Sequence, residues 1–486
     1  MRKSYSNQLR LDSVPIEQVE LNLESRDRIV PILRALQFLY SDRKLVDEIL
    51  QWIADDVNSD SRTDTGRTGM DYWHICVLSA VRLGCNFTYD QLQDLAENHR
   101  KLRAVMGVGD CDERPFKWRT IRNNIGILRP ETIARISQAI VGEGHTLEPV
   151  AIEKVRADSF VMETNIHYPT ESSLLYDGLR KIIPQCVRLA EAHGMNGWRQ
   201  YAHLLKKSKR LNRDINRIAT KKGPRYKQRM KPLYRELLQK AAVLMQRARD
   251  LCLVTGQRLP EIADLFGPNT LQALIIRTER VADTTRRRII HGETVANSDK
   301  LFSIFEPHTQ LYKRGKAGQP MQFGRQVLVF EDAAGFVVHA VLMKRDEDDE
   351  QAAVRETKSL QNDFQNGVKR LSFDRGFHSP DNQRELSELV DHLCLPKTGV
   401  KQSAVQLAGA DDEFRSAQQH HSGVESMIGA LQSGNAMKRC RDRSEIGFER
   451  YLQLGILGRN LHTLGRMLIA RENQNAAAAR SRRKAA

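Results

Sequence analysis

Apolar residues recur at intervals of three and four through residues 15–145, and no alternating segment interrupts them. One such series begins with Ile29, Ile32 and Leu33. This spacing places apolar side chains on one face of a helix. The pattern therefore predicts an all-helical amino-terminal domain over residues 1–148.

Two short segments inside this region could form a helix pair. Thr88, with Gln91 three residues later, is a candidate capping box at the start of YDQLQDLAEN, and FKWRTIRNNIGIL follows after a break rich in Gly, Asp and Cys. Two helices joined by a turn can form a helix-turn-helix that reads DNA, but a plain helical bundle has the same pattern. Both interpretations stay open.

The pattern changes after residue 149. KVRADSFVM alternates and is rich in β-branched and aromatic residues, which predicts a strand with Asp158 near its centre. GRQVLVFED and GFVVHAVLMK predict a β-hairpin, VKRLSFD predicts a strand that ends at Asp374, and HLCLPK predicts one more. Strands that are mixed with helices in this way indicate an α/β fold.

A long helical tract separates the first strand from the hairpin, over about residues 180–315. Residues 206–250 contain 16 Lys and Arg against three acids, a surplus of 13 in a chain whose net charge is +16. Leucines and isoleucines recur through the same segment, so it is expected to be a folded basic helix pair. Its charged face is either a surface that follows phosphates or simply a solvated face.

The remaining segments are predicted from shorter signals. The acidic stretch 346–350 is interpreted as a solvated loop, and Ser379 with Pro380 predicts the start of a helix. A helix is expected around Glu425 and another over residues 447–468. The Ala- and Arg-rich end, 469–486, is predicted to be a basic disordered tail.

Composition narrows the class of partner and the compartment. The net charge of +16 and the pI near 9.6 favour a polyanion such as nucleic acid. Seven cysteines occur singly, without a Cys-x-x-Cys pair, as expected for reduced thiols. The amino terminus lacks an apolar signal region, and no run approaches ~18 apolar residues. We therefore expect a cytoplasmic protein with no membrane partner.

Three carboxylates stand at informative places in this order of elements. A strand with an acid, a hairpin, a helix, a strand that ends in an acid and a later helix with a third acid form the order expected of a ribonuclease H-like fold. Carboxylates suit Mg²⁺, a hard ion that prefers oxygen ligands. Asp374 would face the crevice at the carboxyl end of its strand, with Gly376 allowing a sharp turn. The alternative is that Asp374 only caps that turn.

Three blocks of sequence resemble DDE transposases of bacterial insertion sequences, in an ISNCY-like arrangement. ADSFVMETNIHYPTESSLLYDGLR (157–180) is similar to their first-aspartate block, FDRGFHSPDN (373–382) to their second, and HHSGVESMIGALQSGNAMKRCRDR (420–443) to their glutamate block. Weaker similarity extends from about residue 70 to LGRNLHTLG near 465. Three blocks in the right order are far more specific than any one alone.

The resemblance implies a function and a site. Asp158, Asp374 and Glu425 would be the catalytic residues and the metal ligands, with Mg²⁺, or Mn²⁺ in its place, as the cofactor. The activity would be cleavage and strand transfer of double-stranded DNA, namely the transposon ends and the target. Residues 1–148 would bind the ends, and a ribonuclease H-like catalytic domain would cover 149–468. Recognition of two ends implies a homo-oligomer on DNA, associated with the nucleoid.

Several further residues are candidates for DNA contacts, and each has a purely structural alternative as a turn residue, a helix-surface residue or part of a solvated basic loop. They are His167, Tyr168, Arg375, His421, Lys438, Arg439, Arg441 and Arg443.

The chain also departs from the family pattern. His421 stands where many relatives have an arginine, and Gln432 where many have a lysine. His421 could contact phosphate, support Glu425 or be an ordinary surface histidine. Two rival functions are a catalytically silent DNA-binding regulator and a stand-alone metal-dependent DNA nuclease.

Overall fold

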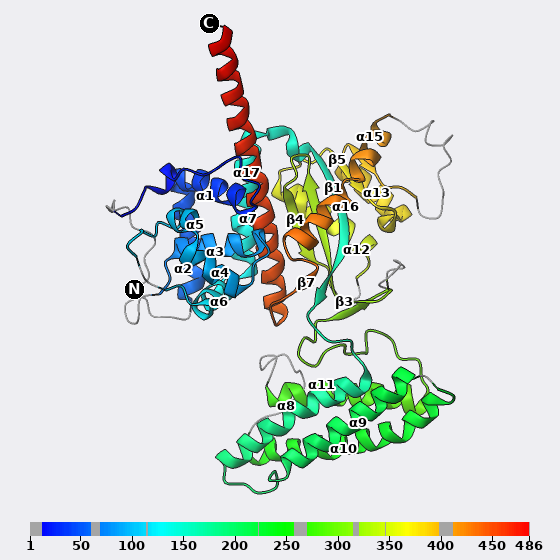
Figure 1. Cartoon of the computed structure of the whole chain (residues 1–486). Helices are drawn as coiled ribbons and strands as arrows, with labels where there is room; N and C mark the ends of the chain where they lie inside the picture. The colour runs from blue at the N-terminus through cyan, green and yellow to red at the C-terminus, as the bar shows by residue number, and fades with distance from the viewer. Residues whose placement is uncertain are drawn as a thin grey trace. The chain divides into compact units, whose positions relative to one another are not determined.

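The computed structural model describes residues 12–59, 69–112, 115–221, 223–256, 270–313, 320–345, 347–397 and 412–485. The chain forms two compact units. The first consists of residues up to 162 together with 326–442 and 446–486, and the second of 163–325 and 443–445. The protein is an α/β protein, mostly helical, with one mixed sheet (Figure 1). Within the described ranges, no helix has both the length and the apolarity to cross a bilayer.

Seven strands in the described ranges form the sheet. Their bounds are β1 (Lys154–Thr164), β2 (Gln310–Tyr312), β3 (Gln322–Asp332), β4 (Val337–Leu342), β5 (Arg370–Phe373), β6 (His392–Cys394) and β7 (Arg439–Cys440). β1 lies between β3 and β5; β4 pairs antiparallel with β3, and β5 is parallel to both β1 and β6. The predicted first strand, hairpin and two later strands are all confirmed, and with them the α/β class.

The amino-terminal helices share a core with the sheet. They are α1 (Ile29–Ser41), α2 (Arg43–Asn58), α3 (Tyr72–Gly84), α4 (Tyr89–Asn98), α5 (Arg100–Val105), α6 (Trp118–Ile127) and α7 (Pro130–Leu147). Their apolar residues belong to the same buried cluster as those of the sheet strands. The predicted helical content of this region is confirmed, and these helices form one compact unit with the sheet.

The carboxy-terminal helix α17 (Glu445–Ala485) connects these helices to the sheet (Figure 1). The Asn460 side chain accepts a hydrogen bond from Val337 N and donates to Val337 O and to Ser137 Oγ, at 2.8–2.9 Å. Gly458 meets Gly84 of α3 so closely that a Cβ on Gly458 would lie 2.5 Å from the Gly84 Cα. Both glycines are therefore required for the helix crossing.

The same helix corrects the prediction of a disordered tail. α17 continues without a break through residues 469–485. Alanine and arginine are among the strongest helix formers, and a helix already nucleated by packed residues extends at little cost. Composition alone suggested disorder because these residues have no apolar stripe.

The remaining helices of the first unit lie after the hairpin. They are α12 (Asp349–Asp363), α13 (Pro380–Leu389), α15 (Asp412–His421) and α16 (Val424–Gly429), the last continuing as a short π-helical segment, η6 (Ala430–Gly434). The predicted cap of α13 is present, since Ser379 Oγ accepts a hydrogen bond from Asn382 N at 3.1 Å. The acidic stretch is only partly a loop, because α12 begins at Asp349.

The second unit is a helical bundle with its own buried core. Its helices are α8 (Glu171–Ala192), α9 (Tyr201–Lys221), α10 (Tyr226–Val254) and α11 (Leu271–Thr285), followed by a π-helical turn at Arg286–His291. It corresponds to the insertion expected over about 180–315. The chain leaves the sheet after β1 and returns to it through β2 and then β3.

Two histidines, the buried His308 and the half-buried His462, make the stability of the fold depend on pH. Burial, together with nearby arginines, lowers the pKa of His308 and of His462 to about 4 in each case, although the charge of Glu445 opposes the shift at His308. In the unfolded chain the pKa is near 6.5, so between pH 6.5 and 4 the unfolded state binds more protons. The free energy of unfolding is expected to be level above pH 6.5. It should then fall toward pH 5 by at most about 1.4 kcal/mol per pH unit for each histidine.

Urea denaturation between pH 7.5 and 5 measures this dependence. His462→Gln should make the slope shallower, whereas replacement of the exposed His203 should leave it unchanged. A wild-type stability that does not change across this range would contradict the burial of both rings in neutral form.

Candidate functional site

Two of the three predicted carboxylates stand at matching positions on neighbouring strands. The parallel register of β1 and β5 aligns Ala157 with Phe373, so Asp158 and Asp374 are the next residues on each strand. Neighbouring strands lie about 4.8 Å apart. Asp374 still has an extended backbone, with φ −75° and ψ 166°. The sheet therefore brings together two acids that are far apart in sequence.

Both aspartates also face the same side of the sheet. Side chains alternate along a strand, so Asp158 shares a face with Arg156, and Asp374 shares one with Ser372. Arg156 Nη1 donates to the His420 carbonyl at 2.7 Å, and Ser372 Oγ lies 3.2 Å from His421 Nδ1. This face is therefore the one covered by the end of α15.

Arg156 fixes the junction between α15 and α16. Its guanidinium donates to Glu331 Oε2 at 2.7 Å from Nε, and its side chain is 16% exposed against 2% for Glu331. A Cβ on Gly423, just before α16, would collide with this guanidinium. A larger residue at 423 would have to displace the guanidinium from this position.

Glu425 lies in the first turn of α16 with its side chain exposed. Val424, Met427 and Leu431 are buried and attach the helix to the core. The predicted orientation of Glu425 away from the core is confirmed. The helix is not continuous, however, since α15 ends at His421 and α16 begins at Val424.

The three acids do not form a closed metal site in this structure. Among the residues that the structure describes, no three His, Cys, Asp or Glu side chains are grouped closely enough to hold a metal ion. Asp158 and Asp374 have the chemistry and the relative register to bind Mg²⁺ through carboxylate oxygens. Glu425 is on α16, which follows the segment where α15 contacts β1 and β5. The position of α16 therefore determines whether Glu425 can be the third ligand.

Asp374 also caps the turn that follows it. Its Oδ1 accepts a hydrogen bond from Arg375 N at 2.7 Å, at the start of the 3₁₀ turn Arg375–Phe377. Asp374 therefore caps this turn, as the alternative interpretation proposed, and also lies beside Asp158. Gly376 does not have a positive φ, so the expected need for glycine in a sharp turn is not borne out.

The histidines of α15 are held neutral by their surroundings. Burial lowers the pKa of His421, while the charge of Asp374 opposes that shift and Arg156 adds to it. Burial, followed by the charges of Arg156 and Lys154, lowers the pKa of His420 to about 4. At neutral pH both rings therefore act as hydrogen-bonding groups and not as phosphate-binding cations.

A polar network on the opposite face of the sheet was not anticipated from the sequence. Gln326 Nε2 of β3 donates to Ser159 Oγ at 2.9 Å and to Asp349 Oδ1 at 2.5 Å. Asp349 Oδ2 also lies 3.8 Å from the point where a Cβ on Gly376 would be. The network thus joins the residue after Asp158 to the turn after Asp374. The sequence signal was Gln326 directly before the apolar run VLVF.

The other DNA-contact candidates have different surroundings. His167 and Tyr168 belong to the second unit, where His167 Nε2 lies 3.4 Å from Asp177 and Tyr168 is 62% exposed against Phe323. Lys438, Arg439 and Arg443 are exposed.

Arg441 is engaged inside the protein. It donates to the Tyr451 hydroxyl at 3.0 Å and to the Phe87 carbonyl at 3.2 Å. A phosphate contact at Arg441 would have to replace these bonds, so its first role is to hold β7 against the amino-terminal helices.

The helix pair α4 and α6 packs together but is not joined by a short turn. The capping box of Thr88 and Gln91 is confirmed, and Gln93 Oε1 accepts a hydrogen bond from Trp118 N at 2.8 Å. The connection contains α5, so a compact helix-turn-helix is not formed. The residues of α6 that are exposed to solvent are Arg119, Thr120, Arg122, Asn123, Gly126 and Ile127.

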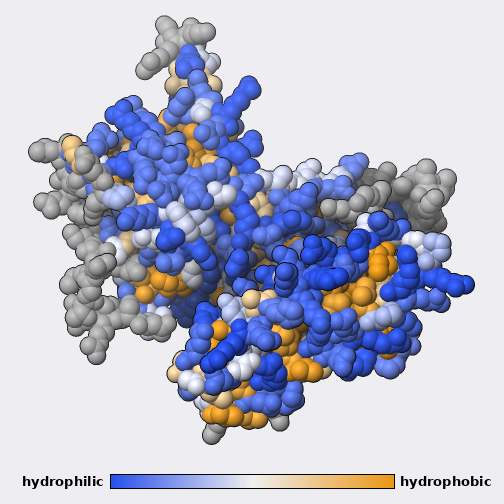
Figure 2. All heavy atoms as spheres, turned by 60° about the horizontal axis from the view of Figure 1, so that its bottom comes forward, coloured by the Kyte–Doolittle hydropathy of each residue, from blue (hydrophilic) through white to orange (hydrophobic). Residues whose placement is uncertain are grey.

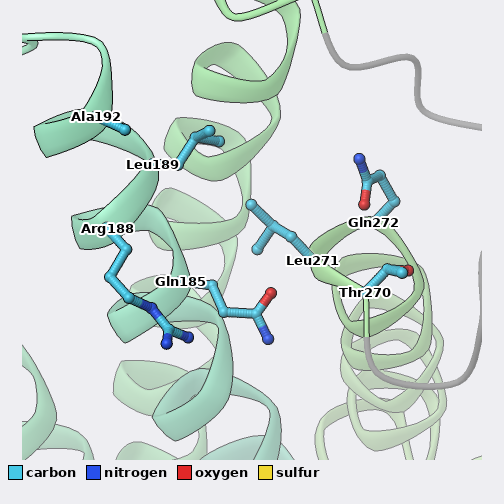
Figure 3. A pocket seen from close by; sticks show the side chains of 7 residues that line it. All are labelled: Gln185, Arg188, Leu189, Ala192, Thr270, Leu271 and Gln272. Carbon is cyan, nitrogen blue, oxygen red and sulfur yellow. The ribbon is translucent and has the colours of Figure 1, made fainter. Parts of the chain in front are cut away.

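A separate hollow of about 580 Å³ opens between α8 and α11 in the second unit (Figure 3). Its lining residues are Gln185, Arg188, Leu189, Ala192, Thr270, Leu271 and Gln272. The lining residues that the structure describes include no acid and no histidine.

Comparisons of the chain with protein-family models, with curated proteins and with solved structures found no match.

Proposed function

We propose that this protein is a DNA transposase that cleaves and joins DNA with carboxylate-bound divalent metal ions. The observation that carries the proposal is the register of Asp158 and Asp374 on neighbouring parallel strands, facing the same side of the sheet. The order of elements supports it, since β1, the β3–β4 hairpin, α12, β5 and α16 follow the sequence expected of a ribonuclease H-like domain.

The proposed roles follow from position. Asp158 and Asp374 would hold the metal ions, and Glu425 would complete the set when α16 presents it to them. Mg²⁺ held by these carboxylates would supply an activated hydroxyl or water and stabilisation of the leaving oxygen at phosphorus. Asp374 also keeps its turn closed through its bond to Arg375 N, so the same carboxylate would fix its own orientation. The exposed polar side chains of α6, together with Lys438 and Arg439, would contact DNA.

The direct test uses the two ends of the DNA segment that carries the gene. Labelled duplexes of these ends are incubated with the protein, with and without Mg²⁺, and nicks and joined products are scored on a sequencing gel. We expect nicks at the element end and joined products only when Mg²⁺ is present. Binding without nicks in either Mg²⁺ or Mn²⁺ would contradict the proposal.

A catalytically silent DNA-binding protein is the second candidate. The observation in its favour is that the described residues contain no closed group of metal-binding side chains. Nicks without joined products would instead indicate a nuclease, so the one assay separates all three functions.

A further inference from the structure

The most concentrated charge in the molecule lies on one face of α9. The residues that make up this α9 basic stripe are Lys206, Lys209, Arg210, Arg213, Arg217 and Lys221. At 100° per residue these positions fall within an arc of about 120°. All six side chains are exposed.

The opposite side of α9 packs into the bundle core. Leu211 and Ile215 are buried, as is Ser208, and Leu204 and Leu205 pack against the same cluster. The helix is therefore fixed in rotation, and its charged side must face away from the core. A stripe that is held in this way is a surface built by the fold and not a mobile charged tail.

Few acids neutralise the stripe. Asp214 is shared by Arg210 at 3.7 Å and by Arg217 at 3.3 Å. Glu236 of α10 pairs with Lys207 and Lys240, which lie beside the stripe. Among the described residues, Lys206, Lys209 and Arg213 form no ion pair. Three positive charges within two turns of α9 are therefore not neutralised by an acid among the described residues.

The dimensions and the charge fit a nucleic-acid backbone. From residue 206 to residue 221 the stripe extends about 22 Å, and phosphates on one DNA strand recur about every 3.4 Å along the axis. The stripe therefore spans about six phosphates. The surface of this unit is largely hydrophilic, interrupted by apolar patches, on the face turned forward in Figure 2. The stripe carries no aromatic side chain for base stacking, and its charged groups suit phosphate oxygens, whose contacts carry no sequence information.

We propose that the α9 basic stripe binds the phosphate backbone of double-stranded DNA without reading its sequence. The inference rests on the proposed function for the identity of the polyanion as the DNA of the mobile element. The proposed binding of DNA to the stripe requires neither a metal ion nor DNA cleavage.

The test compares two triple variants of the full chain with the same change in net charge. In the stripe variant, Lys206, Lys209 and Arg213 become Gln, which removes the charges and keeps a polar side chain of similar helix propensity. In the control variant, Lys358, Arg384 and Lys397, exposed on or near α12 and α13, become Gln. Fluorescence anisotropy measures the Kd for a labelled 30-bp duplex of random sequence from 50 to 300 mM NaCl, without divalent metal.

Each lost phosphate contact should reduce the slope of log K against log salt by about 0.9. The stripe variant should therefore show a slope smaller by about 2.7 and an affinity at least about tenfold weaker at 0.1 M salt. The control should match the wild type, and circular dichroism should show that both variants fold. A stripe variant with the slope and affinity of the control would overturn the inference. Because the assay contains no metal, loss of the proposed cleavage activity would not affect its outcome.

Discussion

Asp374→Asn is expected to reduce Mg²⁺-dependent cleavage of element-end DNA by at least about 100-fold, while end binding persists. Mutation of a residue that only hydrogen-bonds to a metal ligand commonly lowers metal affinity or enzyme activity 10–100-fold. Loss of a direct ligand should have a larger effect. Asparagine keeps an oxygen that can accept the bond from Arg375 N. The substitution therefore removes the negative charge while it preserves the cap.

The same experiment applies to the other two acids. Asp158→Asn and Glu425→Gln should cause losses of similar size, because all three acids are proposed to serve the same ions. Asp381→Asn is the matched control, since Asp381 is a highly exposed acid in the first turn of α13. Its variant should cleave like the wild type. Normal cleavage by any one of the three site variants would remove that residue from the proposed metal site.

Arg156→Met is expected to lower the free energy of unfolding by about 3 kcal/mol. The change would leave the buried Glu331 without its closest cation, and breaking a buried ion pair typically costs 3–5 kcal/mol. Arg459, at 3.5 Å from Glu331, compensates in part, so the lower end of that range is expected. Urea denaturation at pH 7 measures the loss.

A second variant separates stability from positioning. Arg156→Met combined with Glu331→Gln removes the unpaired charge and should recover part of the lost stability. It does not restore the bond from Arg156 to the His420 carbonyl, so α16 should stay poorly held and cleavage should remain low. A single variant as stable as the wild type, or a double variant with full cleavage, would show that Arg156 does not anchor this junction.

The sequence was informative where local patterns decide the structure. Alternation of apolar and polar residues predicted β1 and the hairpin, and the cap of Ser379 marked the start of α13. The pairing of β1 with β5 could not be read in the same way, because more than 200 residues separate them and the register depends on the packing of every intervening element.

The misses have specific physical causes. Asp349 was interpreted as part of a solvated acidic stretch, since its neighbours are charged and its partner Gln326 is remote in sequence. Arg156 was visible as a charged residue in a strand, but only the fold shows that Glu331 and the α15 carbonyl surround it. The tail was predicted from composition, whereas helix propagation from a packed segment determined its structure.

The chain leaves the sheet after β1 and rejoins it through β2 and then β3, and β1 and β3 are hydrogen-bonded neighbours. The 157 residues from 165 to 321, which include the short strand β2, separate the end of β1 from the start of β3. The entropy of closing a loop grows only slowly with its length, so the sheet loses little stability by carrying so large an insert. The insert can therefore change in length or surface charge over evolution while the strand positions that hold the acids stay unchanged.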